Sequence, residues 1–260
     1  ININDVGGFG EGVYRLINYT GALTNNGLVI GTVPGGADPA LGTIQTSVAT
    51  QVNLVYGTPV PTTIQFWDGA DTIGNGAVDG GAGGWTNAQP NWTDAAGANN
   101  TAWAGAFGVF QGTGGIVTVD DAIVFTGAQF MVSGYDIAAG AGSLTTNTAL
   151  TNIRVDPGVT ATISADIGGT GGLLKNDAGL LELNGVNSYS GATNIQGGQL
   201  NVNGGAAIAD TSAVTIAAGA VFQFGDSETI GSLAGAGTVT SGTPVIDGTT
   251  LSVGANNGDA

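Results

Sequence analysis

A short unit recurs along the C-terminal half of the chain and constrains its fold more than any other feature. The unit is a glycine, one or two further residues, an apolar–polar–apolar triplet and a closing glycine. Its copies span residues 179–185, 198–204 and 219–225, with a shorter copy at 250–254. The equivalent side chains Leu183, Val202 and Phe224 are separated by 19 and 22 positions. This spacing is too long for hairpins and is typical of one coil of a solenoid.

Each copy of the unit predicts a β-strand with one buried face. The alternation places two apolar side chains on the same side of the strand. Further alternating segments at 193–195 and 214–216 lie between the copies, so one coil carries more than one strand. Stacked coils would form a continuous core, in which each buried side chain contributes on the order of 1.5–3 kcal/mol. A β-sandwich is the competing fold, because Asn26-Gly27 and Asn184-Gly185 are hairpin signals, but its turns should recur at a shorter period.

The composition agrees with a turn-rich β-protein and excludes several other classes. The chain has 49 glycines but only 7 prolines among its 260 residues, which excludes collagen. It is 42% hydrophobic and 8% charged, the opposite of the balance in disordered chains. Neither cysteine nor histidine occurs in the sequence. Their absence excludes Ser-His-Asp and Cys-His catalysis, and also zinc sites built from His and Cys.

The charge is strongly one-sided. The net charge is −16, because 19 acidic residues stand against three cations, Arg15, Arg154 and Lys175. Nucleic-acid binding depends on many cations, so we expect no nucleic-acid partner. The sequence has no apolar run long enough for a transmembrane helix, and we expect no membrane insertion of this segment. The carboxylates are expected to serve solubility.

The sequence predicts three parts. We expect residues 1–57 to be an N-terminal strand segment that forms further solenoid coils. Residues 58–114 are rich in proline, tryptophan and glycine and predict an inserted loop or small subdomain. Residues 115–260 predict the main parallel β-helix, which contains the most regular repeat at about 171–204. The strand-like runs of the first part are 13–17, 27–30 and 51–56.

Residues 171–202 resemble a known sequence family. They contain Gly171-Gly172-Leu173-x-Lys175, then an alternating leucine strand, then Asn187-x-Tyr189-x-Gly191-x-Thr193 and finally Gly197-Gly198-x-Leu200. This order resembles the autotransporter-associated β-strand repeat over 32 consecutive positions. Weaker similarity to the same family covers segments at 67–69, 84–85, 91–92, 103, 117–119 and 130–135.

The resemblance implies an all-β, right-handed parallel β-helix (β-solenoid) in the passenger domain of a bacterial autotransporter. Such passengers are exported across the outer membrane to the extracellular face of the bacterium. They act in adhesion, aggregation or biofilm formation, so we expect a scaffold or adhesin and not an enzyme. The expected partners are host or bacterial surface glycans or proteins, or further copies of this chain stacked head to tail. Some passengers are proteases or esterases, so the resemblance does not settle activity.

Four tryptophans form the first candidate site. Trp67, Trp85, Trp92 and Trp103 are all the tryptophans of the chain and lie within 37 positions. Exposed rings could stack on sugars, which would make the segment a glycan-binding module. Buried rings would pack a loop against the solenoid, and this interpretation is favoured because tryptophan is highly buried on average.

Carboxylates in the same region form a candidate calcium site. Asp68, Asp71, Asn75 and Asp79 lie in a glycine-rich stretch and could supply oxygen ligands. Their spacing matches neither an EF-hand nor a tandem calcium repeat. A solvated loop without metal is the favoured interpretation, and calcium stays the one cofactor that the sequence allows.

A polysaccharide lyase or hydrolase is the weakest alternative. Asp120-Asp121 is the only adjacent acidic pair, and Arg154 is the only cation near the middle of the chain. Together they could provide the carboxylates and the base that such chemistry needs. A turn after the strand at 117–119 is the favoured interpretation of the acidic pair.

Overall fold

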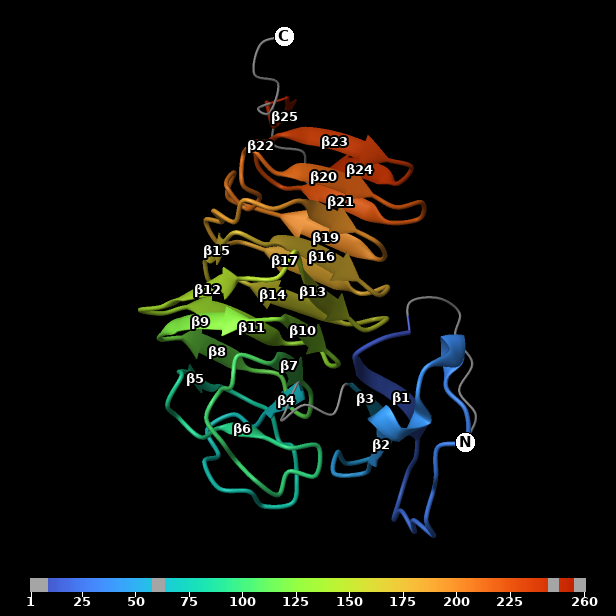
Figure 1. Cartoon of the computed structure of the whole chain (residues 1–260). Helices are drawn as coiled ribbons and strands as arrows, with labels where there is room; N and C mark the ends of the chain where they lie inside the picture. The colour runs from blue at the N-terminus through green and yellow to red at the C-terminus, as the bar shows by residue number, and fades with distance from the viewer. Residues whose placement is uncertain (1–8, 58–63, 243–247, 255–260) are drawn as a thin grey trace.

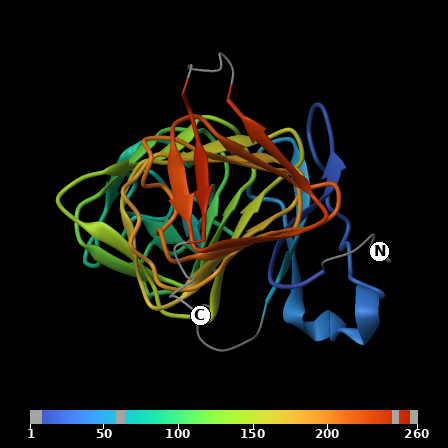
Figure 2. The same cartoon turned by 90° about the horizontal axis from the view of Figure 1, so that it is seen from above.

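The chain folds as a stack of β-coils with a smaller sheet against its flank (Figure 1). This computed structural model describes residues 9–57, 64–242 and 248–254. Seen along its axis, the stack superposes one coil on the next, and the smaller sheet lies outside it (Figure 2). Within these residues the only helical segments are two 3-10 turns, Pro34–Gly36 and Pro39–Leu41. No helix of this part is long and apolar enough to cross a membrane.

The first face of the stack is a nine-stranded sheet. Its order is β23-β20-β18-β16-β13-β10-β7-β4-β6. Neighbours pair in parallel except for β4 and β6, which pair antiparallel. The strands are β4 (Ile64–Trp67), β6 (Trp92–Thr93), β7 (Phe107–Phe110), β10 (Gly127–Phe130), β13 (Leu150–Val155), β16 (Gly172–Asn176), β18 (Thr193–Ile195), β20 (Ala213–Ile216) and β23 (Ser232–Gly235).

The second face is an eight-stranded sheet in which every pair is parallel. Its order is β24-β21-β19-β17-β14-β11-β8-β5. The strands are β5 (Gly83–Trp85), β8 (Ile116–Val119), β11 (Tyr135–Ala139), β14 (Thr160–Ile163), β17 (Leu180–Leu183), β19 (Gln199–Val202), β21 (Val221–Phe224) and β24 (Thr238–Ser241). The shorter third face consists of β9 (Ala122–Phe125), β12 (Ser143–Thr146), β15 (Ile167–Gly169), β22 (Glu228–Ile230) and β25 (Leu251–Val253).

The strands predicted from the recurring unit stack in register. Leu183 of β17 is the Cα partner of Val202 in β19, and Val202 is the partner of Phe224 in β21. All three side chains are buried in one continuous core. At the adjoining corner, the side chain of Asn203 donates a 2.8 Å hydrogen bond to Asn184. The prediction of parallel coils is therefore confirmed.

The last predicted copy of the unit does not continue this row. The place above β21 is taken by β24, whereas β25, which lies within the copy at 250–254, pairs with β22 on the third face. The same apolar–polar–apolar triplet suits any face of a coil, because each face buries alternate side chains. The triplet predicts a strand correctly but does not say which sheet the strand joins.

Residues of the N-terminal part do not form solenoid coils, and that prediction is wrong. The strands β1 (Gly12–Asn18), β2 (Gly42–Gln45) and β3 (Gln51–Tyr56) form a separate antiparallel sheet in the order β1-β3-β2, here called the N-terminal sheet. Alternation of period two fits a half-buried strand of either direction, so it could not exclude this pairing. The expected strand at 27–30 is not formed, and the predicted linker at 58–63 lies outside the described residues.

The prediction of an inserted unit at 58–114 is also only partly correct. β4, β5 and β7 come from this part and pair in parallel with the coils that follow. The solenoid therefore begins within the part that was expected to be a loop or subdomain. Long loops between these strands, together with the antiparallel β6, give the first coil its irregular outline (Figure 1).

Candidate functional site

The four tryptophans close the β4–β5 end of the solenoid core. Trp67, Trp85 and Trp92 are at most 1% exposed, and Trp103 is 7% exposed. Ring centroids lie 4.3 Å apart for Trp92 and Trp103 and 5.0 Å apart for Trp85 and Trp92. Trp67 and Trp103 also donate indole N–H bonds of 2.8 Å to the carbonyls of Gly81 and Val124. The burial of these rings agrees with the favoured interpretation of packing and gives no support to stacking on a glycan, and we name the four rings the tryptophan cap.

The candidate calcium ligands are tied together by asparagine amides. Asp68 is buried, and its two carboxylate oxygens accept bonds of 2.9 Å from the backbone N–H of Asp79 and from the Asn100 amide. The Asn75 amide donates to Asp79 at 2.7 Å and to Asp71 at 3.4 Å. Burial raises the pKa of Asp68, and the two hydrogen bonds partly oppose this. Among the described residues no three His, Cys, Asp or Glu side chains form a metal-binding group, and calcium at Asp68, Asp71 and Asp79 stays a prediction.

The candidate lyase residues are not assembled into one site. Asp120 and Asp121 lie between β8 and β9, where Asp121 accepts a 2.8 Å bond from the backbone N–H of Asn87. Arg154 instead points outward from β13 and pairs with Asp177 at 2.8 Å. Arg154, the only central cation, is therefore paired with Asp177 and not with Asp120 or Asp121. The structure therefore gives no support to the lyase alternative.

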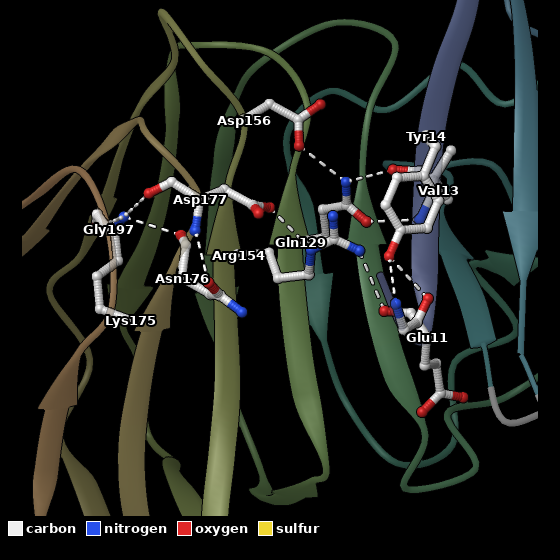
Figure 3. A network of polar contacts seen from close by, with 11 residues as sticks. Glu11, Val13, Tyr14, Gln129, Arg154, Asp156, Lys175, Asn176, Asp177 and Gly197 are labelled. Atoms are coloured by element: carbon white, nitrogen blue, oxygen red, sulfur yellow. Dashed lines mark hydrogen bonds and ion pairs between the residues drawn. The ribbon is translucent and has the colours of Figure 1, made fainter. Parts of the chain in front are cut away.

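A polar network joins the N-terminal sheet to the solenoid (Figure 3). Gln129 of β10 faces β1, and its amide pairs with the backbone of Val13 through two hydrogen bonds of 2.7 Å. One of these bonds is donated by the Val13 N–H and the other is donated to the Val13 carbonyl. The Gln129 amide also donates to Asp156 at 2.8 Å. A glutamine side chain thus takes the place that a neighbouring strand would occupy.

Arg154 forms the second half of this network (Figure 3). Besides its ion pair with Asp177, it donates a 3.1 Å bond to the carbonyl of Glu11 and lies 4.5 Å from the centre of the Tyr14 ring. Gly12 has φ +143°, and a Cβ at this position would overlap the guanidinium. Glycine is therefore required here both by its conformation and by the close approach of Arg154.

The network places ionisable groups where little water reaches them. Burial acts to lower the pKa of Arg154, but Asp177 and Tyr14 reverse this and the net shift is upward. Burial also raises the pKa of Asp156, although the bond from Gln129 and the charge of Arg154 act in the opposite direction. The low dielectric of a buried site strengthens the attraction within the ion pair. It also raises the free-energy cost of leaving either charge unpaired.

Apolar contacts complete this interface, and we call its solenoid side the flank. Outward apolar side chains of the first three coils pack here under the N-terminal sheet. The contacts join Val13, Val48 and Val55 to Phe66, Phe107, Val109 and Met131, and the neighbouring loop contributes Val78. The end of β2 and the loop after it also reach the region of the tryptophan cap, because Gln45 and Ser47 both donate to the carbonyl of Ala95.

The sequence did not reveal the flank, although one signal was present. β7 has Phe107, Val109 and Phe110, so apolar side chains occupy both of its faces. A strand that is apolar on both faces indicates a cover on each side. Gln129 and Tyr14 carry no comparable signal, because their partners come from more than a hundred positions away.

The regular repeat owes its motif to buried polar bonds. Lys175 points inward and donates to the carbonyls of Asn176, Asp177 and Gly197 at 2.9, 2.9 and 3.0 Å. Burial lowers its pKa to about 8, against the opposing charge of Asp177. The lysine of the motif therefore holds the carbonyls of a turn from inside the stack. The positive charge of a lysine gives no indication of this buried role.

The asparagine and tyrosine of the motif support the third face. Asn187 accepts a 2.8 Å bond from the backbone N–H of Ile167 and donates a 2.7 Å bond to the carbonyl of Ala207. It thus links the coils on either side where the third face has no strand. Tyr189 is fully buried and lies 2.7 Å from the hydroxyl of Thr193. These bonds explain why the motif needs these residue types at this spacing.

Comparisons with known proteins agree with this structure. Residues 173–202 match the family described as the passenger-associated transport repeat. Over 212 residues, 76% of this chain, the sequence is 42% identical to a protein named adhesin BmaC autotransporter from Brucella suis biovar 1 (strain 1330). The matched region is only 6% of that relative's length. No solved structure matches the chain.

The stacked coils and the two matches define the class of protein. The chain is a β-solenoid segment of an autotransporter passenger domain, and residues 173–202 are its passenger-associated transport repeat. As such a passenger it is exported to the bacterial cell surface.

Proposed function

We propose that this segment is a rigid scaffold within a bacterial surface adhesin, that it contributes to attachment, and that it carries out no catalysis. The observation that carries the proposal is the unbroken parallel sheet of the second face, in which eight strands hold one register. A stack of this kind presents side chains at fixed intervals of about 4.8 Å. The adhesin name of the relative supports the same role.

The outer side of this sheet supplies the surface for attachment. One row of outward positions crosses seven coils, is polar after its first member and is at least partly exposed throughout. A flat polar surface with few cations suits hydrogen bonding to glycans or proteins of a host or bacterial surface. This outward row consists of Ile116, Asp136, Thr162, Glu182, Asn201, Gln223 and Thr240.

Display on a non-adhesive bacterial host tests the proposal. Cells carrying the chain should attach to matrix proteins or glycans at least several-fold more than cells without it. Glu182→Lys with Asn201→Lys should remove this gain, because both side chains lie within the outward row. A control with the same charge change, Asp38→Lys with Asn26→Lys, alters exposed residues away from that row and should attach like the unchanged chain. Absence of attachment despite folded display would contradict the adhesive role.

A further inference from the structure

The N-terminal sheet is a unit with a core of its own. Val33, Leu54 and Tyr56 are buried together, apart from the solenoid core, and side chains of the covering loops pack against them. The partly buried residues of this cluster are Phe9, Tyr14, Leu16, Ile30, Ala37 and Leu41. One face of the sheet is thus covered locally, and the other face meets the flank.

Contacts at the flank join residues that are far apart in the sequence. The bonded pairs are 116 and 143 positions apart in sequence, and the chain passes from one unit to the other once, between Gly57 and Ile64. Gln129 recognises backbone atoms of Val13, and Arg154 recognises the Glu11 carbonyl and the Tyr14 ring. The N-terminal sheet of a second molecule carries the same atoms.

We propose that the flank also binds the N-terminal sheet of a second copy, so that two passengers exchange these sheets. Exchange of an identical element is a low-cost route to a dimer, because it needs no new interface. The inference rests on the proposed cell-surface role, which places many copies side by side and raises their local concentration.

The structure favours exchange of the N-terminal sheets, at the side of the solenoid, over stacking of coil ends. At the start of the nine-stranded sheet, β6 already pairs with the edge of β4, so this edge is not free for head-to-tail stacking. Repulsion between two chains of net charge −16 opposes any side-by-side contact, and salt screens it. Exchange should therefore increase with ionic strength, since the flank contacts themselves are buried.

Two complementary variants of the full chain test the exchange. Gly12→Val introduces a side chain that displaces Arg154, so its N-terminal sheet cannot dock, but its own flank is intact. Gln129→Ala with Arg154→Ala damages the flank but leaves the N-terminal sheet unchanged. Only in a mixture can the intact sheet of the second variant reach the intact flank of the first. A Val13→Lys variant replaces Gly12→Val if that variant does not fold.

Sedimentation velocity at raised salt gives the readout. Each variant alone should sediment as a monomer of 25.3 kDa, and the equimolar mixture should contain a species of twice that mass. A mixture of either variant with a chain carrying all three changes should stay monomeric. Unchanged tryptophan fluorescence would show that the cap, and so the solenoid, is intact in every variant. If the complementary mixture also stays monomeric, the sheet docks only within its own chain and the inference is wrong, whatever the attachment assay finds.

Discussion

At the scale of single residues, two of the three cations serve structure. Arg154 and Lys175 are buried, whereas Arg15 is exposed, so the described surface is more one-sidedly acidic than the net charge suggests. The role of Lys175 could not be read from sequence, because a lysine in an alternating strand is normally assigned to the outer face. Its three carbonyl partners lie at the end of its own strand, in the turn that follows and in the next coil, and only the fold brings them together.

Lys175 predicts an unusual dependence of stability on pH. Its pKa is lowered from 10.5 to about 8 in the folded state, so between these values the unfolded chain binds the extra proton. The free energy of unfolding should therefore rise with pH from about 8, by up to about 3 kcal/mol from this group. Above pH 10 the buried Tyr135 and Tyr189, whose pKa values burial raises, act in the opposite direction.

Urea unfolding at pH 7, 8, 9 and 10 measures this effect, and Lys175→Met isolates it. The difference in free energy of unfolding between the unchanged chain and the variant should change by about 2–3 kcal/mol in favour of the unchanged chain over this range. Arg15→Met, at an exposed cation, serves as the control and should give a constant difference. A constant difference for Lys175→Met as well would show that the buried amine does not titrate as described.

At the scale of elements, the sequence predicted strands better than it predicted their partners. The triplets at β17, β19 and β21 gave both the strands and their register, because glycines at the corners fixed the period. The N-terminal strands β1 and β3 were recognised, but their antiparallel pairing depends on chain direction, which alternation does not encode. The tryptophan cap was located, and packing was favoured over binding, yet only the fold shows that the four rings meet one another.

Removal of one ring from the tryptophan cap should destabilise the solenoid. Trp85→Ala removes a side chain that is 1% exposed and contacts both Trp92 and Trp103. Loss of a buried large aromatic costs about 3–5 kcal/mol, which urea unfolding followed by circular dichroism can measure. Ile73→Ala, at a side chain that is 80% exposed, is the control and should change stability by less than about 0.5 kcal/mol. If Trp85→Ala changed stability as little as Ile73→Ala, the tryptophan cap would not be packed.

At the scale of the whole molecule, stability comes from contacts between neighbouring coils. No single coil buries its own inner face, so each depends on the coils above and below it. The passenger-associated transport repeat forms only one of these interfaces, and coils outside the matched residues continue the same register on both sides of it. The scaffold role therefore depends on an unbroken stack between the tryptophan cap and β24.

A distance measurement along the outward row tests this claim most directly. Ile116 and Thr240 are exposed and end the row, six coil steps apart. At about 4.8 Å per step their backbones should be about 29 Å apart. The chain has no cysteine, so Ile116→Cys with Thr240→Cys can carry two spin labels at defined positions. Pulsed electron resonance should give one narrow distribution centred near this distance once the label arms are included, whereas a broad or clearly longer distribution would contradict a continuous, in-register solenoid.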